Sequence, residues 1–469
     1  MRPRIVIAAL KGGSGKTLVS LGLVSAWRGA GVEVAPFKKG PDFIDAGWLT
    51  FAAGRPCYNL DPFLMNEAQV LASFLTHSEK AGISVVEGNR GLYDGLNLDG
   101  CCSTAELARQ LRAPVLVILD VSMATRTMAA IIKGCQVFDP GLDIAGVILN
   151  RVAGPRQERL IADAISQYCD LPVLGAIPRL KQDLFPERHM GLVPFQERDH
   201  AVKAVSWARE TVEQHLALDE IRRIARGAPD LAGSGREESP VTPDDSGDAP
   251  RIGFIRDRSF WFYYPENLAY LEELGAELVE INAISDPGLP AIDALYIGGG
   301  FPETQASALS ENRPFREDLR REIEEGLPVY AECGGLMYLG EALLLGGKDY
   351  PMVGAIPVRF VLQKRPRGHG YTVLEVDRPN PYFPEGETIR GHEFHYSRPI
   401  FSGDDPPDLV FRVRRGHGMD GKRDGICRKN LLATYTHIHA AGNAKWAEYL
   451  FRAAVRSGGK TPGGIKKND

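Results

Sequence analysis

Short apolar runs recur along the first half of the chain, and each ends in a polar or glycine-rich stretch. The runs are residues 5–9, 32–37, 83–87, 114–120, 144–150 and 172–178. Continuous rather than alternating hydrophobicity is typical of strands buried on both faces, as in a parallel sheet covered by helices. We therefore predict an α/β domain with a parallel sheet, whose first helix spans residues 18–28 and whose last helical stretch ends near Ile224.

The same pattern returns in the second half, after a stretch without apolar periodicity. Residues 227–250 are rich in Gly, Pro, Ser, Asp and Glu, which predicts a flexible linker. Beyond it, strands are predicted at residues 252–255, 294–297, 328–332 and 431–439. We therefore predict two α/β domains, residues 1–226 and 251–456, followed by a polar tail at residues 457–469.

A glycine-rich motif, Lys11-Gly-Gly-Ser-Gly-Lys16-Thr17, lies between the first predicted strand and the first predicted helix. In such a phosphate loop, backbone N–H groups and the helix N-terminus face an anion, a lysine reaches the outer phosphates and a hydroxyl ligates magnesium. We predict that the nucleotide is bound by Gly12, Gly13, Gly15, Lys16 and Thr17. Leu10 stands where the usual motif has its first glycine, a form shared by partition-type ATPases and by biotin- and corrin-pathway ligases.

Charged residues follow later predicted strands. Lys39, Asp42 and Asp45 lie in one short stretch, and Asp94 follows another strand. Ligands in open α/β sheets bind beyond the carboxyl ends of the strands, so we predict that these four residues contact the substrate. For the two aspartates the alternative is turn formation, which a Gly-Pro-Asp sequence favours unaided.

The nucleotide site also needs groups for its metal and its base. Glu87 ends a predicted strand, and it resembles the carboxylate that faces a phosphate loop. We predict that magnesium is ligated by Thr17, Asp42 and Glu87, and that Asn150, at the end of another strand, contacts adenine. The expected cofactors are therefore ATP and Mg²⁺.

In the second half, a short predicted strand ends in Ala331-Glu332-Cys333-Gly334-Gly335, and an apolar helix follows at once. A residue at such an elbow is often held in a strained conformation with its side chain projecting above the sheet. A cysteine at the start of a helix is placed to become a thiolate nucleophile. The alternative is a buried core cysteine beside a turn.

Two other stretches supply partners for this thiol. The Gly298–Gly300 loop presents backbone N–H groups, and we predict that a developing oxyanion is held by Gly299, Gly300 and Gly334. His437 lies on the last predicted strand and is the expected base, with His439 two residues on and thus on the same strand face. Thiol, amides and imidazole together indicate acyl transfer through a thioester.

The histidines also allow other interpretations. His437 and His439 could ligate a metal ion, but no third ligand has suitable spacing. His392 and His395 fit a solvated loop or a domain interface equally well.

Composition narrows the class of protein. The 469 residues carry a net charge of −5 with a pI near 6.1, which indicates no nucleic-acid partner and no acidic membrane surface. No apolar run is long enough to span a bilayer, and the N-terminus has the pattern of a strand rather than of a signal peptide. The 7 cysteines include no CxxC pair, so we predict a reducing cytoplasm, no disulfide framework and no structural zinc site.

Several longer motifs occur in one order across both halves: Phe37-Lys-Lys-Gly-Pro-Asp-Phe-Ile-Asp45, Asn59-Leu-Asp-Pro62, Pro186-Glu-Arg-His189, Phe262-Tyr-Tyr-Pro-Glu-Asn267, Gly298-Gly-Gly-Phe-Pro-Glu303 and Ala331-Glu-Cys-Gly-Gly-Leu-Met337. Over about residues 3 to 452, they resemble the cobyrinate a,c-diamide synthase family. The resemblance implies a dethiobiotin-synthetase-like ATP domain joined to a class I glutamine amidotransferase domain, with Cys333 as nucleophile and His437 as its base. Class I amidotransferases usually carry Glu where His439 stands, so the residue that orients His437 is left open.

The resemblance also implies a reaction. The a- and c-acetate carboxylates of cobyrinate would become acyl phosphates and then take up ammonia that Cys333 releases from L-glutamine. Sirohaem and nickel sirohydrochlorin are alternative anionic tetrapyrrole substrates, because Lys39 stands where the family pattern has an apolar residue. A partition-type ATPase switch, which the phosphate loop alone suggests, would leave Cys333 and His437 without a use. Whether the protein forms a homodimer is left open.

Overall fold

The computed structural model describes residues 2–180, 187–188, 191–192, 198–231, 249–403 and 407–458. The chain divides into two compact units, Met1–Glu238 and Ser239–Asp469. Most of the predicted linker (232–248) and of the predicted tail (459–469) lies outside the described residues, so the domain boundaries stay predictions. Among the described helices, none combines the length and the apolar character that crossing a bilayer requires.

The first unit, over its described residues, is built on a seven-stranded parallel sheet in the order β3-β2-β4-β1-β5-β6-β7. The strands are β1 (Arg4–Ala9), β2 (Val34–Lys39), β3 (Tyr58–Leu60), β4 (Ile83–Glu87), β5 (Val115–Asp120), β6 (Ile144–Val152) and β7 (Val173–Pro178). The predicted parallel α/β fold is confirmed. β2 begins two residues later than predicted, because the Val32 N–H bonds the Trp27 carbonyl in a turn. The strand ends at Lys39, two residues beyond the predicted end.

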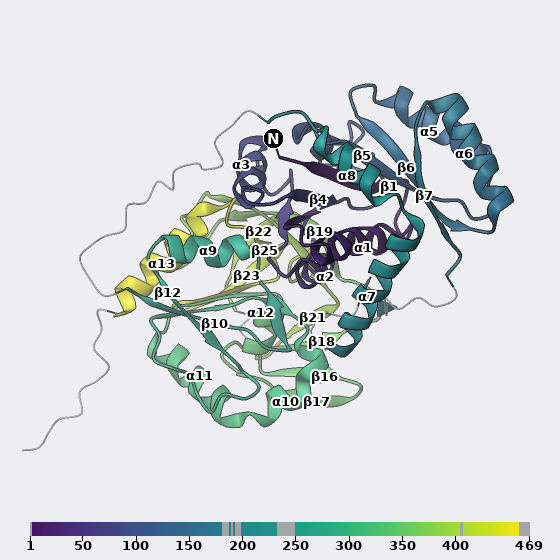
Figure 1. Cartoon of the computed structure of the whole chain (residues 1–469). Helices are drawn as coiled ribbons and strands as arrows, with labels where there is room; N and C mark the ends of the chain where they lie inside the picture. The colour runs from purple at the N-terminus through teal and green to yellow at the C-terminus, as the bar shows by residue number, and fades with distance from the viewer. Residues whose placement is uncertain are drawn as a thin grey trace, which may run out of the picture. The chain divides into compact units, whose positions relative to one another are not determined.

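Helices cover the faces of this sheet. They are α1 (Lys16–Gly29), α2 (Ile44–Ala53), α3 (Glu67–His77), α4 (Thr104–Gln110), α5 (Thr127–Phe138), α6 (Pro155–Cys169), α7 (Arg198–His215) and α8 (Leu218–Arg226). Ile5 of β1, Leu21 of α1, Trp48 of α2 and Val212 of α7 share one core cluster. Figure 1 shows α1 beside α7 and α5 beside α6. Each large apolar side chain buried in this way contributes roughly 1.5–3 kcal/mol, which anchors β1 and the loop after it.

One predicted loop of the first unit is described only in part. In the polar stretch at Pro186–His189, β8 (Glu187–Arg188) pairs with β9 (Gly191–Leu192). Pro186 and His189 lie outside the described residues.

The second unit, as far as it is described, contains a ten-stranded mixed sheet in the order β12-β10-β13-β15-β24-β23-β22-β19-β20-β25. Its parallel half comprises β12 (Glu277–Ile281), β10 (Arg251–Ile255), β13 (Ala294–Ile297), β15 (Val329–Glu332) and β24 (Leu431–Thr434). Its antiparallel half comprises β23 (Arg423–Arg428), β22 (Leu409–Arg415), β19 (Gly368–Val376), β20 (Thr388–His395) and β25 (His437–Ile438).

Smaller elements complete the second unit. The helices are α9 (Pro265–Glu273), η1 (Pro302–Gln305), α10 (Ala306–Glu311), α11 (Arg313–Glu325), α12 (Gly334–Leu339) and α13 (Ala444–Gly458). β11 (Phe260–Phe262) pairs with β14 (Gly299–Gly300), and a four-stranded sheet joins β16 (Ala342–Leu345), β17 (Lys348–Pro351), β18 (Val358–Leu362) and β21 (Ser397–Phe401). The predicted second α/β domain is confirmed.

Two strands that follow each other in the chain, β24 and β25, lie far apart in the order of the large sheet. β24 and β25 are separated by two residues in the chain, yet β24 lies within the order and β25 at its end. The Ile438 N–H of β25 nevertheless donates to Glu332 of β15, which is a neighbour of β24. The antiparallel half therefore curves round and returns β25 to the carboxyl end of β15.

The single strand predicted over residues 431–439 is wrong in its extent. β24 ends at Thr434, and β25 holds only His437 and Ile438. Between them the Tyr435 N–H donates to the Asp424 carboxylate at 3.2 Å and the Thr436 N–H donates to the Thr434 hydroxyl at 3.1 Å. Because these side chains replace the ladder of backbone hydrogen bonds, His437 and His439 do not share the face of one continuous strand.

Candidate functional site

The glycine-rich loop of the first unit has a backbone that requires glycine at two positions. Gly13 has φ +70° and Gly15 has φ +101°, both in the left-handed region. A Cβ atom on Gly15 would also lie 2.3 Å from Nδ2 of Asn150. The loop leads directly into α1, which begins at Lys16, as in a phosphate loop.

A charged cluster lies against this loop. Thr17 Oγ1 donates to Glu87 Oε1 at 3.0 Å, and Lys38 Nζ lies 2.9 Å from the same oxygen and 2.6 Å from Oδ2 of Asp45. The other oxygen of Glu87, Oε2, is buried and has no hydrogen-bond partner among the described residues. An orphaned carboxylate oxygen beside a hydroxyl is a suitable donor pair for a hard cation such as Mg²⁺.

The charges of this cluster balance each other. Burial alone would lower the pKa of Lys38, but the carboxylates of Asp45 and Glu87 raise it above its usual value. Burial also lowers the pKa of Lys16, whose Nζ donates to the Arg90 carbonyl at 2.8 Å. An ammonium that has lost much of its hydration interacts more strongly with a phosphate than an exposed one would.

The predicted substrate residues are partly engaged within the chain. Asp42 Oδ1 accepts from the N–H groups of Ile44 at 2.8 Å and Asp45 at 3.2 Å, which favours the turn interpretation of this aspartate. Burial, with the Asp45 charge nearby, raises the pKa of Asp42 to about 7. Asp94 Oδ2 accepts from the Gly91 N–H at 2.9 Å, and Lys39 is buried at the end of β2. Contacts of these four residues with a substrate stay predictions, as does a metal at Asp42.

A cavity of about 550 Å³ opens beside the loop. Away from the charged cluster its lining includes Asn150, Arg151, Pro178, Leu180 and Trp207. Asn150 Nδ2 donates to the Ser14 carbonyl at 2.8 Å, and its Oδ1 accepts from the Arg151 N–H at 2.9 Å. This side chain therefore ties the loop to β6, and its predicted contact with adenine stays a prediction.

Cys333 stands at a strained elbow between β15 and α12. Its φ of 46° and ψ of −95° lie in a region that non-glycine residues avoid, a strain of roughly 1–3 kcal/mol that clusters at functional sites. The Cys333 N–H donates to the Thr434 carbonyl at 2.8 Å, and Sγ faces the Phe394 carbonyl at 3.7 Å. Burial, with the charges of Glu303 and Glu332, raises the pKa of Cys333, so the resting group is a thiol.

His437 has a carboxylate partner on β15. Its Nδ1 lies 3.3 Å from Oε2 of Glu332, whose other oxygen accepts from the Ile438 N–H at 3.1 Å. Tyr296 donates its hydroxyl to Oε2 at 3.2 Å. Burial lowers the pKa of His437 to about 3 and raises that of Glu332 to about 8. When Glu332 is ionised, it accepts from Nδ1 of the neutral imidazole, and Nε2 is available to accept a proton.

The three glycines predicted to hold an oxyanion come together near this imidazole. A Cβ atom on Gly299 would lie 2.3 Å from Cε1 of His437, and one on Gly334 would lie 2.9 Å from the Gly300 nitrogen. Gly300 has φ +154°, and its Cβ would meet the Ser259 carbonyl at 1.9 Å. Only residues without side chains pack this closely, although oxyanion binding itself stays a prediction.

The remaining histidines have separate partners. His439 Nε2 lies 3.6 Å from Oε2 of Glu266, so this residue does not orient His437. The rings of His392 and His437 lie 4.9 Å apart, and His392 Nδ1 is 3.2 Å from the Tyr264 hydroxyl. His392, His395 and His439 are buried, and His392 and His395 lie on β20, so the solvated-loop interpretation of these two is wrong. The described residues contain no metal-ligand cluster that includes these histidines.

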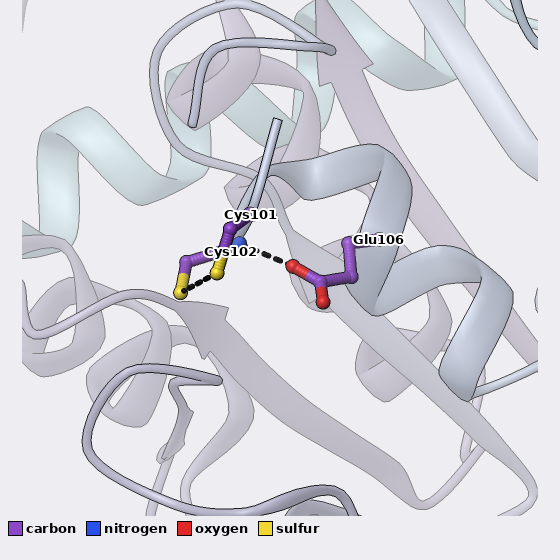
Figure 2. Close-up of side chains that lie close together, drawn as sticks. All are labelled: Cys101, Cys102 and Glu106. Atoms are coloured by element: carbon purple, nitrogen blue, oxygen red, sulfur yellow. Dashed lines mark hydrogen bonds between the residues drawn. The ribbon is translucent and has the colours of Figure 1, made fainter. Parts of the chain in front are cut away.

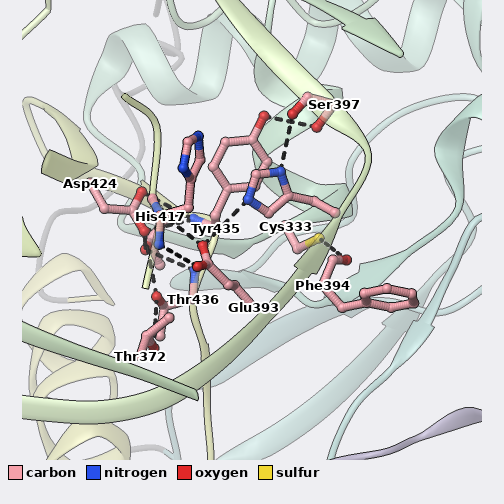
Figure 3. Close-up of polar contacts among 12 residues, drawn as sticks. Cys333, Thr372, Glu393, Phe394, Ser397, His417, Asp424, Tyr435 and Thr436 are labelled. Carbon is pink, nitrogen blue, oxygen red and sulfur yellow. Dashed lines mark hydrogen bonds and ion pairs between the residues drawn. The ribbon is translucent and has the colours of Figure 1, made fainter. Parts of the chain in front are cut away.

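A buried polar network supports the strand that faces Cys333. Figure 3 shows Cys333 directed at the Phe394 carbonyl, with Glu393 next to it on β20. Glu393 accepts from the N–H groups of His417 and Gly418, and His395 Nε2 lies 3.4 Å from its Oε2. Satisfied buried networks of this kind rigidify a site.

Two family models match the chain. Residues 5–193 match the CobQ/CobB/MinD/ParA nucleotide binding domain, and residues 251–445 match the CobB/CobQ-like glutamine amidotransferase domain. A cobyrinate a,c-diamide synthase from Magnetococcus marinus is 42% identical, covering 96% of this chain and 97% of that protein. Proteins of the same name from Archaeoglobus fulgidus and Listeria innocua are 40% and 39% identical, each over 97% of this chain.

The chain belongs to the cobyrinate a,c-diamide synthase family.

Membership confirms the resemblance seen in the sequence, and with it the class of glutamine-dependent amidating ligases. The family match covers both units, so a partition-type switch, which has no use for Cys333 or His437, does not account for the chain. A nucleotide-binding domain is confirmed.

Sequence reasoning missed two residues that the structure places in the sites. Lys38 lies in the Phe37–Asp45 motif, and strand alternation points it at Glu87, its register partner on β4. Glu332 faces His437, and the signal for it in the sequence is a carboxylate within an otherwise apolar strand.

Proposed function

We propose that this member of the cobyrinate a,c-diamide synthase family amidates the a- and c-acetate carboxylates of cobyrinate, using MgATP and L-glutamine. One observation carries the proposal. A single chain holds both the phosphate loop with its Thr17–Glu87 cluster and the Cys333–Glu332–His437 elbow, over nearly the full length of relatives that bear this name.

The first unit supplies the activation step. A carboxylate is a poor acyl donor, and transfer of the γ-phosphoryl group from ATP gives an acyl phosphate and ADP. Lys16 would contact the outer phosphates, and Thr17 with Oε2 of Glu87 would hold Mg²⁺, which would neutralise phosphate charge. Lys38 keeps Glu87 and Asp45 in place between turnovers, because its ammonium bonds both carboxylates.

The second unit supplies the nitrogen. His437 takes the Cys333 proton on Nε2 as Sγ attacks the side-chain amide carbon of glutamine, and Glu332 stabilises the imidazolium through Nδ1. The Gly299 and Gly334 amides stabilise the oxyanion. Ammonia leaves, and water then hydrolyses the thioester to release glutamate. The ammonia displaces phosphate from the acyl phosphate, forming the amide.

Substrate choice rests with the first unit. Cobyrinate, sirohaem and nickel sirohydrochlorin all present acetate carboxylates, and a buried Lys39 at the end of β2 suits any of them electrostatically. The shared name of the relatives favours cobyrinate.

The deciding experiment offers the three tetrapyrroles separately to the purified protein with MgATP and glutamine, and reads the products by mass. A gain of two amide groups on cobyrinate alone is expected. A Cys333→Ser variant is expected to lose amidation with glutamine but to keep it with added ammonia. Amidation of another tetrapyrrole in preference to cobyrinate would contradict the proposed substrate, and glutamine-driven activity in the variant would contradict the mechanism.

A further inference from the structure

Two adjacent cysteines in the first unit form a compact group with a glutamate. Cys101 and Cys102 end the loop between β4 and α4, and their Sγ atoms lie 3.2 Å apart. Glu106 of α4 accepts the Cys102 N–H through Oε2. One donor atom from each of the three residues lies within 4.8 Å of the other two. Figure 2 shows the two thiols side by side next to the Glu106 carboxylate.

The loop holds these groups in place before any ligand arrives. The Cys101 carbonyl accepts from Leu96 N–H at 2.8 Å, and the Cys101 N–H donates to Oδ1 of Asn97 at 3.0 Å. Cys102 has φ +62°, a left-handed conformation that persists only where surrounding bonds impose it. Ser103 accepts the Glu106 N–H at 3.1 Å and so starts α4 with Glu106 beside Cys102.

We propose that Cys101, Cys102 and Glu106 bind one thiophilic divalent cation of the Zn²⁺ class. Such an ion takes thiolate sulfur at about 2.3 Å and carboxylate oxygen at about 2.0–2.2 Å, so donors around one ion lie within roughly 4.5 Å of each other. The observed group meets this limit after a shift of a few tenths of an ångström, with the sulfurs opening to about 3.8 Å for tetrahedral geometry. Solvent supplies the fourth ligand.

The charged groups around Cys101 and Cys102 are compatible with a bound divalent cation. Binding releases one proton from each thiol, so the ion with two thiolates and one carboxylate has a net charge of −1. Lys39 and Asp61 lie within electrostatic range of Cys102. The Lys39 ammonium favours the negatively charged complex.

The other chemistry open to adjacent thiols is oxidation to a disulfide. The third donor favours the metal, because Glu106 would contribute nothing to an S–S bond, yet it is fixed against the pair by the Cys102 N–H. The sequence indicated no zinc site because no CxxC pair occurs. In the structure, the two thiols are instead brought together because the cysteines are adjacent and Cys102 has a left-handed backbone. The inference does not depend on the proposed amidation.

The test titrates Cd²⁺, a spectroscopic substitute for Zn²⁺, into the reduced, metal-free, full-length protein without nucleotide. The readout is the ultraviolet thiolate-to-cadmium charge-transfer band. One equivalent is expected to generate the band, and Zn²⁺ is expected to remove it by competition. Cd²⁺ at the carboxylates of Asp45 and Glu87 gives no such band, so the nucleotide site does not interfere.

Variants assign the band to the cluster. Cys101→Ser and Cys102→Ser are each expected to abolish it, and Glu106→Gln to weaken Cd²⁺ binding at least about tenfold. Cys427→Ser, which changes a half-buried thiol in the second unit, is the matched control and should leave the titration unchanged. Thermal melting of each variant separates lost binding from lost folding. A band that survives in the Cys101→Ser/Cys102→Ser double variant overturns the proposal, as does a reduced protein that binds no Cd²⁺ and instead loses two hydrogens at this pair on treatment with oxidised glutathione.

Discussion

Glu332 lies 3.3 Å from Nδ1 of His437, and it immediately precedes Cys333 in the chain. The carboxylate that faces the imidazole therefore comes from the strand that carries the nucleophile, not from the strand of the histidine. Its second oxygen accepts the Ile438 N–H, so one side chain fixes both the ring and the backbone of β25. His439, at the position where a glutamate is usual, contacts Glu266 instead.

Replacing Glu332 by glutamine should impair glutamine use selectively. A glutamine amide can donate to Nδ1, which places the imidazole proton on Nε2 and removes the base. We expect kcat for glutamine hydrolysis to fall about 10²–10⁴-fold, while amidation with added ammonia stays within about twofold of the parent. Paired assays with glutamine and with ammonia measure both.

The matched control for this variant is His439→Gln. Because Glu332 bonds Nδ1 of His437 while Nε2 of His439 lies against Glu266, we expect glutamine hydrolysis to change by less than about threefold. Loss of activity in His439→Gln with retention in Glu332→Gln would reverse the assignment.

The pH dependence of glutamine hydrolysis should follow Glu332. Its pKa is raised to about 8, so the carboxyl is protonated below that pH and ionised above it. The ionised form can only accept, which keeps the proton on Nδ1 and frees Nε2. His437, with a pKa lowered to about 3, stays neutral throughout this range. We expect kcat/KM for glutamine to rise about tenfold per pH unit from pH 5 to 7 and to level off above pH 8, and Glu332→Gln to lack the rise.

The sequence predicted both α/β folds and the residues at the tips of their loops, because continuous apolar runs and glycine motifs are local signals. It did not predict how the second sheet curves, since the pairing of β20 with β25 joins residues distant in the chain. Glu332 was therefore not connected with His437. The two backbone N–H groups that bond Oδ1 of Asp42 were also not predictable, because only the folded turn brings them near it.

Adding one methyl group at Gly299 should disable the base. The new Cβ would lie 2.3 Å from Cε1 of His437 and 3.0 Å from Cδ1 of Phe262, so the imidazole must move. Displacement of about 1 Å at a catalytic group typically reduces a rate about 10²-fold. We expect Gly299→Ala to lose glutamine hydrolysis and to keep ammonia-driven amidation. Gly134→Ala, at a position with open space around the new Cβ and no left-handed φ, is the control and is expected to leave glutamine hydrolysis unchanged.

Lys38 should be a strong determinant of stability in the first unit. Its side chain is 2% exposed and bonds two carboxylates, so Lys38→Met leaves Asp45 and Glu87 as neighbouring uncompensated charges. Breaking a buried ion pair in this way typically destabilises by about 3–5 kcal/mol. Urea unfolding followed by tryptophan fluorescence measures the loss. Lys39→Met is the comparison, because burial lowers the pKa of Lys39 and removing its charge should cost far less.

Substitutions should show that Glu87 ligates the metal and that Asp42 stabilises a turn. Oε2 of Glu87 is buried beside Thr17 with no hydrogen-bond partner among the described residues, whereas Oδ1 of Asp42 already accepts two backbone N–H groups. Glu87→Gln is therefore expected to weaken Mg²⁺-dependent ATP binding at least about tenfold, with binding in the presence of a chelator little changed. Asp42→Asn keeps an acceptor oxygen for the turn and removes only the charge, so its Mg²⁺ dependence should match the parent. Calorimetric titration of ATP with and without Mg²⁺ compares the two variants, and a loss confined to Asp42→Asn would return the metal to the aspartate.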